Sequence, residues 1–269
     1  MKALSMRNVS VVRGGSRILD SVSLDIDEGE NVAILGRNGS GKTTLVRLLR
    51  GEVRPYYDES DPPRMSIFGE EDWDLFSLRR SMGVVSMDLQ SAFGGGTTVA
   101  EAVASGFFGA MDVFRNTRVT AEMAAAAHRS ARLMGMEDLM DRRMDTLSLG
   151  EARRALIARA MVTDPRVLVL DEPMTGLDIV MASRFRRMFD LLAGRGVGIV
   201  MVTHDPSDIP ECVRRVVLMR EGAVFADGPK EEVLASETVS AAYGERINVG
   251  MDMGVYHMRM GDAPGGSDP

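Results

Sequence analysis

The chain has 269 residues, a hydrophobic fraction of 45% and a formal net charge of −7. This length suits one large α/β domain, and the acidic balance without a basic stripe argues against a nucleic-acid partner. The apolar runs are far shorter than the roughly 20 residues of a membrane helix, the first ten residues lack a secretory-type stretch, and the single Cys212 favours a reducing compartment, so we expect cytoplasmic residence.

Two different patterns of apolar residues predict strands in the first 35 residues and between residues 167 and 202. The first 30 residues alternate between apolar and polar positions on either side of Arg13-Gly14-Gly15, which predicts antiparallel strands joined by a turn. Three later runs, at 32–35, 167–170 and 198–202, are continuously apolar, as is typical of parallel strands buried on both faces. Polar residues follow each run directly. Because the carboxyl ends of parallel strands form the ligand crevice of α/β sheets, we expect these three ends to converge on one site.

The middle of the chain has a helical pattern. The alanine-rich segments 119–134 and 151–161 contain few β-branched residues and predict helices. We interpret the region as a helical lobe inserted into a sheet domain. We therefore expect a single domain over residues 1–250, with a core at 1–92 and 163–245, an inserted lobe at about 93–162, and a partly disordered tail at 251–269.

A glycine-rich motif follows the first continuous apolar run. Residues 36–43 (GRNGSGKT) match G-x-x-x-x-G-K-[ST] and lie between a predicted strand and a predicted helix. In such a loop, backbone N–H groups and the helix N-terminus surround the β-phosphate, while Lys42 reaches the β- and γ-phosphates and Thr43 ligates Mg²⁺. We therefore predict that Mg²⁺ and ATP bind here, with the nucleotide held by Gly36, Arg37, Asn38, Gly39, Ser40, Gly41, Lys42, Thr43 and Thr44.

Two adjacent carboxylates, Asp171 and Glu172, end the second continuous run. Taken alone, an acidic strand end is more often a solvated turn. The glycine-rich loop favours a catalytic interpretation instead. Asp171 is then expected to hold Mg²⁺, while Glu172 polarises a water for attack on the γ-phosphate.

The segment 147–151 (LSLGE), which precedes a predicted helix, resembles the signature loop of ABC-type ATPases. Gln90 resembles that family's Q-loop glutamine, Asp178 lies in a segment that resembles its D-loop, and His204 resembles its switch histidine. The resemblance covers about residues 2–245. It implies an α/β fold of the P-loop NTPase (RecA-like) class, with a mostly parallel sheet core, an N-terminal antiparallel β subdomain and an inserted α-helical subdomain.

Each of these residues also has an ordinary interpretation. Ser148 and the Gly150 amide precede a helix N-terminus and could bind an anion, although a serine there would serve equally well as an N-cap. Gln90 alone would be a surface glutamine, and His204 alone a hydrogen-bonded histidine near a core edge. The family placement implies that Gln90 and His204 are catalytic, that Gln90 also ligates Mg²⁺, and that Ser148, Gly150 and Asp178 contact nucleotide.

Three positions depart from the family pattern. Leu149 and Glu151 stand where the family has glycine and glutamine, and we expect Leu149 to crowd the nucleotide. Arg13 stands where the family stacks an aromatic ring on adenine. An arginine plane can stack there too, so we predict that Arg13 contacts the base.

The resemblance also implies partners and a function. In this family two cassettes pack head to tail, and most members power transport through separate integral membrane subunits. We therefore expect a second copy, membrane transporter subunits and a substrate-binding protein as partners, on the cytoplasmic face of the inner or plasma membrane. The residues after Gln90 resemble the ATPases of metal-chelate, molybdate or vitamin B12 importers. The alternatives are a non-transport ABC ATPase of translation, repair or cofactor assembly, and a small-molecule P-loop kinase.

Overall fold

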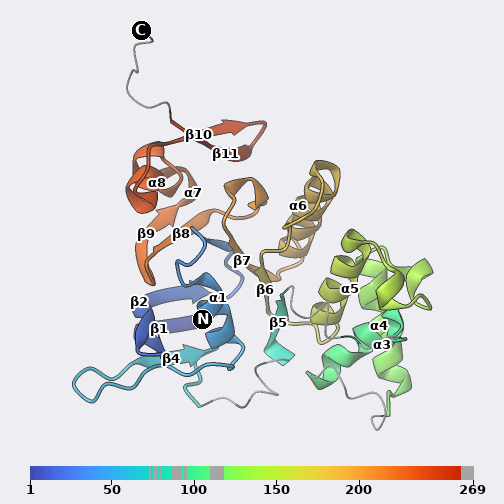
Figure 1. The fold of residues 1–269 in the computed structure, drawn as a ribbon. Coiled ribbons are helices and arrows are strands. Elements are labelled where there is room, and N and C mark those ends of the chain that lie inside the picture. Colours follow the sequence, from blue (N-terminus) through green and yellow to red (C-terminus); the bar gives the residue numbers. More distant parts are fainter. Residues whose placement is uncertain are drawn as a thin grey trace. The chain divides into compact units, whose positions relative to one another are not determined.

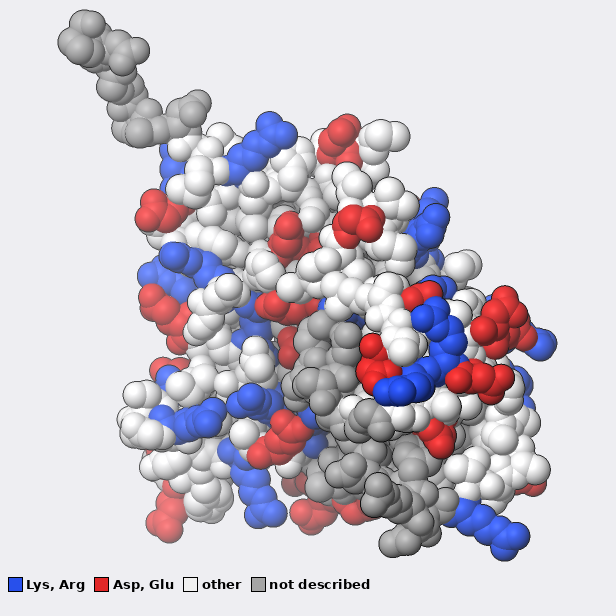
Figure 2. Space-filling view, turned by 45° about the vertical axis from the view of Figure 1, so that its right-hand side comes forward, with Lys and Arg blue, Asp and Glu red and all other residues white. Residues whose placement is uncertain are grey.

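The computed structural model describes residues 1–72, 74, 78, 80–86, 93, 96–109 and 118–261. The chain forms two compact units, the first made of Met1–Glu71 with Ile199–Pro269 and the second of Asp72–Gly198 (Figure 1). Within the described part of the chain, no helix is both long and apolar enough to cross a membrane. On the face displayed in Figure 2, acidic and basic side chains are interspersed.

An antiparallel sheet opens the first unit. Its strands are β1 (Lys2–Arg13), β2 (Ser16–Asp27) and β4 (Arg64–Ile67), in the order β2-β1-β4. Arg13 pairs with Ser16 across a turn in which Gly14 and Gly15 both have positive φ. The predicted pair of antiparallel strands around this turn is therefore confirmed. One face of β1 and β2 is fully buried, including Met6, Val9 and Leu19.

A second sheet of the first unit is mostly parallel. β3 (Val32–Gly36) pairs in parallel with β7 (Gly198–Thr203) on one side and with β8 (Arg215–Arg220) on the other, and β9 (Ala223–Pro229) pairs antiparallel with β8. Every residue of β3 and β7 is buried, as their continuous apolar pattern predicted. Helix α1 (Lys42–Leu49) follows β3 and buries Leu45, Val46, Leu48 and Leu49.

The chain after β7 completes the first unit. It contains the 3₁₀ turn η6 (Pro206–Asp208), helices α7 (Lys230–Val233) and α8 (Ser236–Tyr243), and a hairpin of β10 (Ile247–Asp252) and β11 (Val255–Met260) beyond them (Figure 1). Val249 and Tyr256 of the hairpin pack against a core that includes Ala33, Leu35 and Leu218. Residues 251–260 of the predicted tail thus belong to this hairpin, whereas 262–269 lie outside the described residues.

The second unit combines one strand pair with a helical bundle. β5 (Met82–Val85) and β6 (Val167–Asp171) are parallel, and Val85 pairs with Leu170. The predicted helices of this region are confirmed as α4 and α5, which pack together with α3 (Figure 1). Among its described residues, the helices and 3₁₀ turns of this unit are α3 (Val99–Ala104), η2 (Ser105–Phe108), α4 (Ala121–Leu133), η4 (Glu137–Leu139), η5 (Met144–Thr146), α5 (Leu149–Met161) and α6 (Ile179–Ala193).

Buried polar contacts fix the bundle. The Ser130 hydroxyl of α4 donates to the Ala158 carbonyl of α5 at 2.6 Å, and Arg159 Nε of α5 donates to the Ser105 hydroxyl at 2.9 Å. Both serines are buried, so these hydrogen bonds satisfy groups that would be costly to bury alone. The bundle therefore holds α5, and with it the segment 147–151, in a defined position.

Candidate functional site

The glycine-rich loop connects β3 to α1 through a tight bend in the first unit. Gly39 and Gly41 have φ of 85° and 101°, in the left-handed region that favours glycine. A Cβ on Gly36 would lie 2.6 Å from both the Met219 carbonyl oxygen and Ser40 Oγ, and one on Gly41 would lie 2.8 Å from Leu19 Cδ2. The bend therefore requires glycine at positions 36 and 41.

Polar groups gather where the bend meets α1. The helix begins after Gly41, and no described side chain caps it, so its amides and its dipole are suited to an anion. Ser40 is 4% exposed, and its hydroxyl has no hydrogen-bond partner among the residues that the structure describes. Lys42 is also buried, and its ammonium donates to the carbonyls of Gly36 at 2.7 Å and Arg37 at 3.0 Å. This arrangement of amides, hydroxyl and ammonium is suited to a phosphate group.

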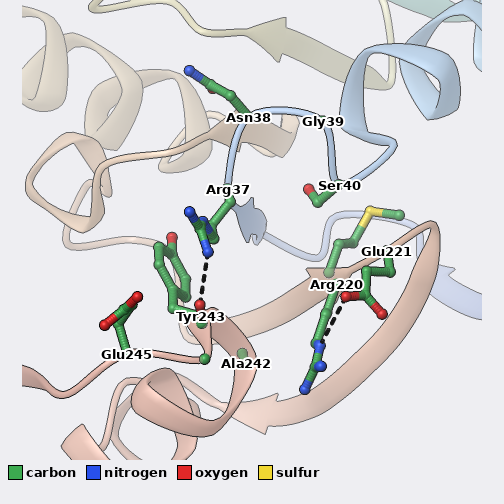
Figure 3. Close-up of a pocket in the computed structure, with 11 residues that line it drawn as sticks. Arg37, Asn38, Gly39, Ser40, Arg220, Glu221, Ala242, Tyr243 and Glu245 are labelled. Atoms are coloured by element: carbon green, nitrogen blue, oxygen red, sulfur yellow. Dashed lines mark hydrogen bonds and ion pairs between the residues drawn. The ribbon is translucent and has the colours of Figure 1, made fainter.

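A cavity of about 400 Å³ adjoins the outer side of the loop. It lies between residues 37–40, the turn after β8 and the end of α8 (Figure 3). The Arg37 side chain points to Tyr243 and donates to its carbonyl at 2.8 Å, whereas the Asn38 side chain points away from Tyr243 (Figure 3). Burial raises the pKa of the Tyr243 hydroxyl to about 12, so this group is neutral at physiological pH.

His204 follows the end of β7 in the same unit. Because Leu35 of β3 pairs with Thr203 of β7, Gly36 and His204 follow at the same edge of the sheet. The Thr203 hydroxyl donates to the Asp208 carboxylate at 2.6 Å, which fixes the turn after His204. Two of the three predicted strand ends are thus brought together.

The other residues of this unit that we predict to bind nucleotide or Mg²⁺ are exposed or half-buried. Thr43 is exposed and Thr44 is half-buried in the first turn of α1. Arg13 is exposed at the end of β1, directly before the turn to β2. The same β2 contacts the glycine-rich loop, because the carbonyl oxygen of Ile18 would lie 2.9 Å from a Cβ on Gly41. The contact of Arg13 with a base stays a prediction.

The carboxylate pair lies in the second unit. Asp171 ends β6, and Glu172 follows it with a φ of 47°, in the left-handed region that non-glycine residues rarely adopt. A residue held in this region stores on the order of 1–3 kcal/mol of strain. The Thr175 hydroxyl donates to the Glu172 carboxylate at 3.2 Å, and the Thr175 amide donates to the Glu172 carbonyl at 3.3 Å. The turn after β6 therefore holds both the backbone and the carboxylate of Glu172 through Thr175. That this pair meets the glycine-rich loop stays a prediction.

Ser148 is the N-cap of α5 and forms a capping box with Glu151. The Glu151 carboxylate accepts from both the amide and the hydroxyl of Ser148 at 2.8 Å. These hydrogen bonds, the one from the Ser148 amide above all, lower the pKa of Glu151. The N-cap interpretation is thus realised in the structure, and binding of a phosphate at the same helix end stays a prediction.

The side chain of Leu149 packs toward the segment after β6. A Cβ on Gly176 would lie 3.3 Å from Leu149 Cδ2, and a Cβ on Gly150 would lie 2.7 Å from Met181 Cε. That Leu149 crowds a nucleotide stays a prediction. Asp178 caps α6 by accepting from the amides of Val180 and Met181 at 2.9 Å. Gln90 lies outside the described residues.

Sequence reasoning missed two residues beside Glu172. Arg153 of α5 is 0% exposed and donates to the carbonyls of Pro173 and Thr175. Its signal in the sequence is its place just after the segment 147–151 that resembles the signature loop, one helical turn beyond Leu149. Thr175 carries no signal of its own, because its role depends on the fold of the turn.

A model of the ABC transporter family matches residues 19–175, which is more than half of the chain. The chain belongs to this family. An uncharacterised ABC transporter ATP-binding protein of Bacillus subtilis, YlmA, is 32% identical over 91% of this chain and 92% of its own length. The cobalt import ATP-binding protein CbiO of Rhodobacter capsulatus is 34% identical over 91% of this chain and 85% of its own.

Solved structures agree with this membership. The structure of CbiO1 from Clostridium perfringens, part of an ABC transporter complex, has a TM-score of 0.74 and 28% identity over 89% of this chain and 93% of its own. The predicted P-loop NTPase fold, with its antiparallel subdomain and helices, is therefore confirmed. The chain is an ATP-binding ABC ATPase.

We predict that Lys42→Ala weakens ATP binding about ten- to a hundredfold, which is the worth of a charge-assisted hydrogen bond of about 1.5–3 kcal/mol. Hydrolysis should fall in parallel, and calorimetric titration with ATP measures the loss. Lys2→Ala removes the same charge from the exposed start of β1 and is the matched control. Wild-type affinity and turnover in Lys42→Ala would refute the phosphate-binding role of the loop.

A second prediction concerns the capping box. Because the folded state lowers the pKa of Glu151, its carboxylate stabilises the fold above the ordinary value of 4.5, and this contribution is lost as the pH falls through the folded-state pKa. Glu151→Gln should therefore lower the free energy of unfolding by about 0.3–1 kcal/mol at pH 7, with no difference at pH 3. Urea unfolding at both pH values measures this, with the exposed Glu221→Gln as control. A difference that persists at pH 3 would contradict it.

Proposed function

We propose that this ABC ATPase is the motor subunit of an importer that moves a metal chelate or a related small solute through separate membrane subunits. The observation that carries the proposal is the bend after β3, with its buried Lys42 and Ser40 beside the uncapped end of α1. The relative from Rhodobacter capsulatus is named a cobalt import protein, and the Clostridium perfringens structure is described as part of a transporter complex. Both descriptions support a transport role for a cassette of this kind.

The nucleotide is proposed to bind with its β- and γ-phosphates over the N-terminus of α1. The Ser40 hydroxyl then gains a partner, and Lys42 exchanges its contacts with the loop carbonyls for contacts with phosphate oxygens. The guanidinium plane of Arg13 stacks on the adenine. All of these groups belong to the first unit.

Hydrolysis is proposed to use Glu172 as the general base. A water oxygen attacks the γ-phosphorus in line with the bond to ADP, Glu172 accepts a proton from that water, and the bond from the γ-phosphorus to the bridging oxygen breaks to leave ADP and inorganic phosphate. The left-handed backbone of Glu172 supports this role, because strained backbone states are concentrated at functional sites. Gln90 and His204 orient the water and the γ-phosphate.

Magnesium is proposed to accompany the nucleotide. Thr43 offers an exposed hydroxyl in the first turn of α1, and Asp171 offers a carboxylate at the end of β6. With the side-chain oxygen of Gln90, these are the hard donors that Mg²⁺ prefers beside phosphate oxygens. When bound, Mg²⁺ neutralises charge that develops on the phosphates. The donor set therefore fits the ion.

A complete catalytic site is proposed to need a second copy of the chain. Ser148 is exposed at the start of α5, and with Gly150 and Asp178 it would contact the nucleotide held by the other copy. Ile179 and Val180, directly after Asp178, are 83% and 57% exposed and would be covered on association. ATP binding closes such a pair, and hydrolysis releases it.

Membrane subunits are proposed to dock on the second unit. Phe107 and Phe108 are half-buried, and Phe107 lines a cavity of about 370 Å³ together with Arg80, Thr120, Glu122, Met123 and Ala126. Its lining of three apolar residues beside Arg80, Thr120 and Glu122 offers both apolar and polar contacts to an inserted helix. The protein would then lie on the cytoplasmic face of the inner or plasma membrane, with a substrate-binding protein delivering the solute. The net charge of −7 and the mixed surface of Figure 2 argue against a nucleic-acid partner.

Glu172→Gln should bind ATP but lose most phosphate release, because the amide keeps the size of the side chain but cannot accept the proton. Blocked hydrolysis should leave the closed pair populated, so size-exclusion chromatography should show a dimer only for this variant in Mg·ATP. Glu232→Gln, at an exposed position on α7, is the control and should behave as wild type.

Normal turnover in Glu172→Gln would remove this residue from the mechanism. An inactive variant that stays monomeric in ATP would preserve the base but contradict closure by ATP alone.

For the transport role, we predict that the tagged chain, expressed in its native host, co-purifies with a polytopic membrane protein after detergent extraction. Solute uptake by the host should then fall when Lys42→Ala replaces the wild type. Recovery from the soluble fraction with ribosomes, repair proteins or cofactor-assembly proteins would instead support a non-transport ABC ATPase.

A further inference from the structure

Arg153 occupies an unusual place for a charged side chain, because it is 0% exposed within the second unit. It projects from α5 to the segment between β6 and α6, where its Nη1 donates to the carbonyl of Pro173 and, at 3.2 Å, to the carbonyl of Thr175. Burying a guanidinium costs free energy unless it is well hydrogen-bonded, and bonds from a charged donor are the strong ones. Arg153 is therefore a firm attachment between the helix and this turn.

The turn that Arg153 holds is the one that shapes Glu172. Pro173 follows Glu172 directly, and Thr175 contacts Glu172 through both its hydroxyl and its amide. Glu172 itself is in the left-handed region, a backbone state that persists only when the surroundings enforce it. The two carbonyls bound by Arg153 lie on either side of Met174, so the guanidinium fixes the turn just beyond the strained residue.

The start of α5 packs on the same segment through its apolar residues. Leu149 lies against Gly176, and the end of the Met181 side chain lies against Gly150. Leu149 and Arg153 are one helical turn apart, so the contact with Gly176 and the bonds to Thr175 hold consecutive residues of one loop. The helix end and the turn of Glu172 therefore form one connected piece.

We propose that Arg153 is a positioning residue for the reaction, in that its guanidinium holds the turn after β6 so that the Glu172 carboxylate keeps the direction that general-base catalysis needs. This inference rests on the proposed role of Glu172. A contribution to stability alone does not explain a buried arginine at position 153. A well-packed apolar side chain often stabilises a buried position as well as a charged one does, or better.

The neighbouring Arg154 provides a matched control on the same helix. Its guanidinium donates to the carbonyls of Met134 and Gly135 at the end of α4, at 3.3 and 3.0 Å, and thus joins two helices of the bundle. The two arginines are adjacent and both bind backbone carbonyls, but only Arg153 binds the turn of Glu172. Arg154→Gln therefore tests the loss of an arginine from α5 without the loss of that turn.

The experiment compares Arg153→Gln, Arg153→Lys and Arg154→Gln by steady-state ATP hydrolysis, ATP titration and amide hydrogen exchange. Arg153→Gln should lower kcat about ten- to a hundredfold, the cost of misplacing a catalytic group, with ATP affinity unchanged. Exchange of the amides of residues 174–178 should be faster. Arg153→Lys, which keeps the charge but lacks the planar fork, should give a kcat between those of the wild type and Arg153→Gln. Arg154→Gln should keep the wild-type kcat.

A double-mutant cycle separates positioning from general damage. If Arg153 acts through Glu172, adding Arg153→Gln to Glu172→Gln should lower the residual rate no further, since the group it positions is already disabled. Wild-type kcat in folded Arg153→Gln, or an equal loss in Arg154→Gln, would overturn the proposal. Should Arg153→Gln not fold, Arg153→Lys decides by the same criteria. Normal turnover in Glu172→Gln would instead refute the proposed base, so the two failures are distinguishable.

Discussion

The bend between β3 and α1 leaves no space for a side chain at its first and last glycines, and much of the first unit is arranged around that constraint. The Ser40 carbonyl accepts from the Gly222 amide, and the Gly222 carbonyl in turn accepts from the Asp20 amide. The loop is thereby bonded to the turn after β8 and, through it, to β2. Because β3 is paired on both sides by parallel strands, the bend cannot relax by moving the strand. The backbone of this bend, which we propose to bind phosphate, is therefore held in place by its neighbours.

The second unit meets a different constraint, because its catalytic candidate stands in a strained backbone state at the end of a strand. A non-glycine residue at this φ needs surroundings that outweigh its cost. Those surroundings are α5, which contributes Arg153 and Leu149, and the hydrogen bonds from Thr175. The bundle of α3, α4 and α5 thus has a role beyond its own packing. It supplies the support on which the geometry of Glu172 depends.

Patterns that depend on neighbouring residues were readable from the sequence, and contacts between distant segments were not. The glycine-rich loop, the strands β3, β6 and β7, and the helices α4 and α5 follow from local sequence. A strand buried on both faces leaves a continuous apolar run, and a helix favours residues without β-branching. Ser148 was also readable as a cap from local sequence. The burial of Arg153, the direction of Leu149 and the packing of β10 and β11 on the core depend on which segments meet. No periodicity encodes that.

The backbone of Glu172 was also beyond sequence reasoning. An Asp-Glu pair at a strand end is compatible with an ordinary solvated turn, and these residue types do not predict a positive φ at the glutamate. The same limit applies to the cavity beside the glycine-rich loop, which brings Arg37 together with Tyr243, two residues that are 206 positions apart. Such features come from the assembled fold, whereas motifs show only which chemistry is available.

The capping box at the start of α5 has a consequence for how that helix end meets another molecule. Its donors are already directed at an anion, since the Glu151 carboxylate receives both the amide and the hydroxyl of Ser148. A phosphate that binds here would therefore displace the Glu151 carboxylate, and it would meet an N-terminus of α5 that is already ordered. Such preorganisation removes the entropic cost of ordering this helix end on binding. It also means that the negative charge of the ligand competes with the negative charge of Glu151. If this helix end binds nucleotide as we propose, it would favour a strongly charged ligand, since a weakly charged one would gain little by displacing a carboxylate.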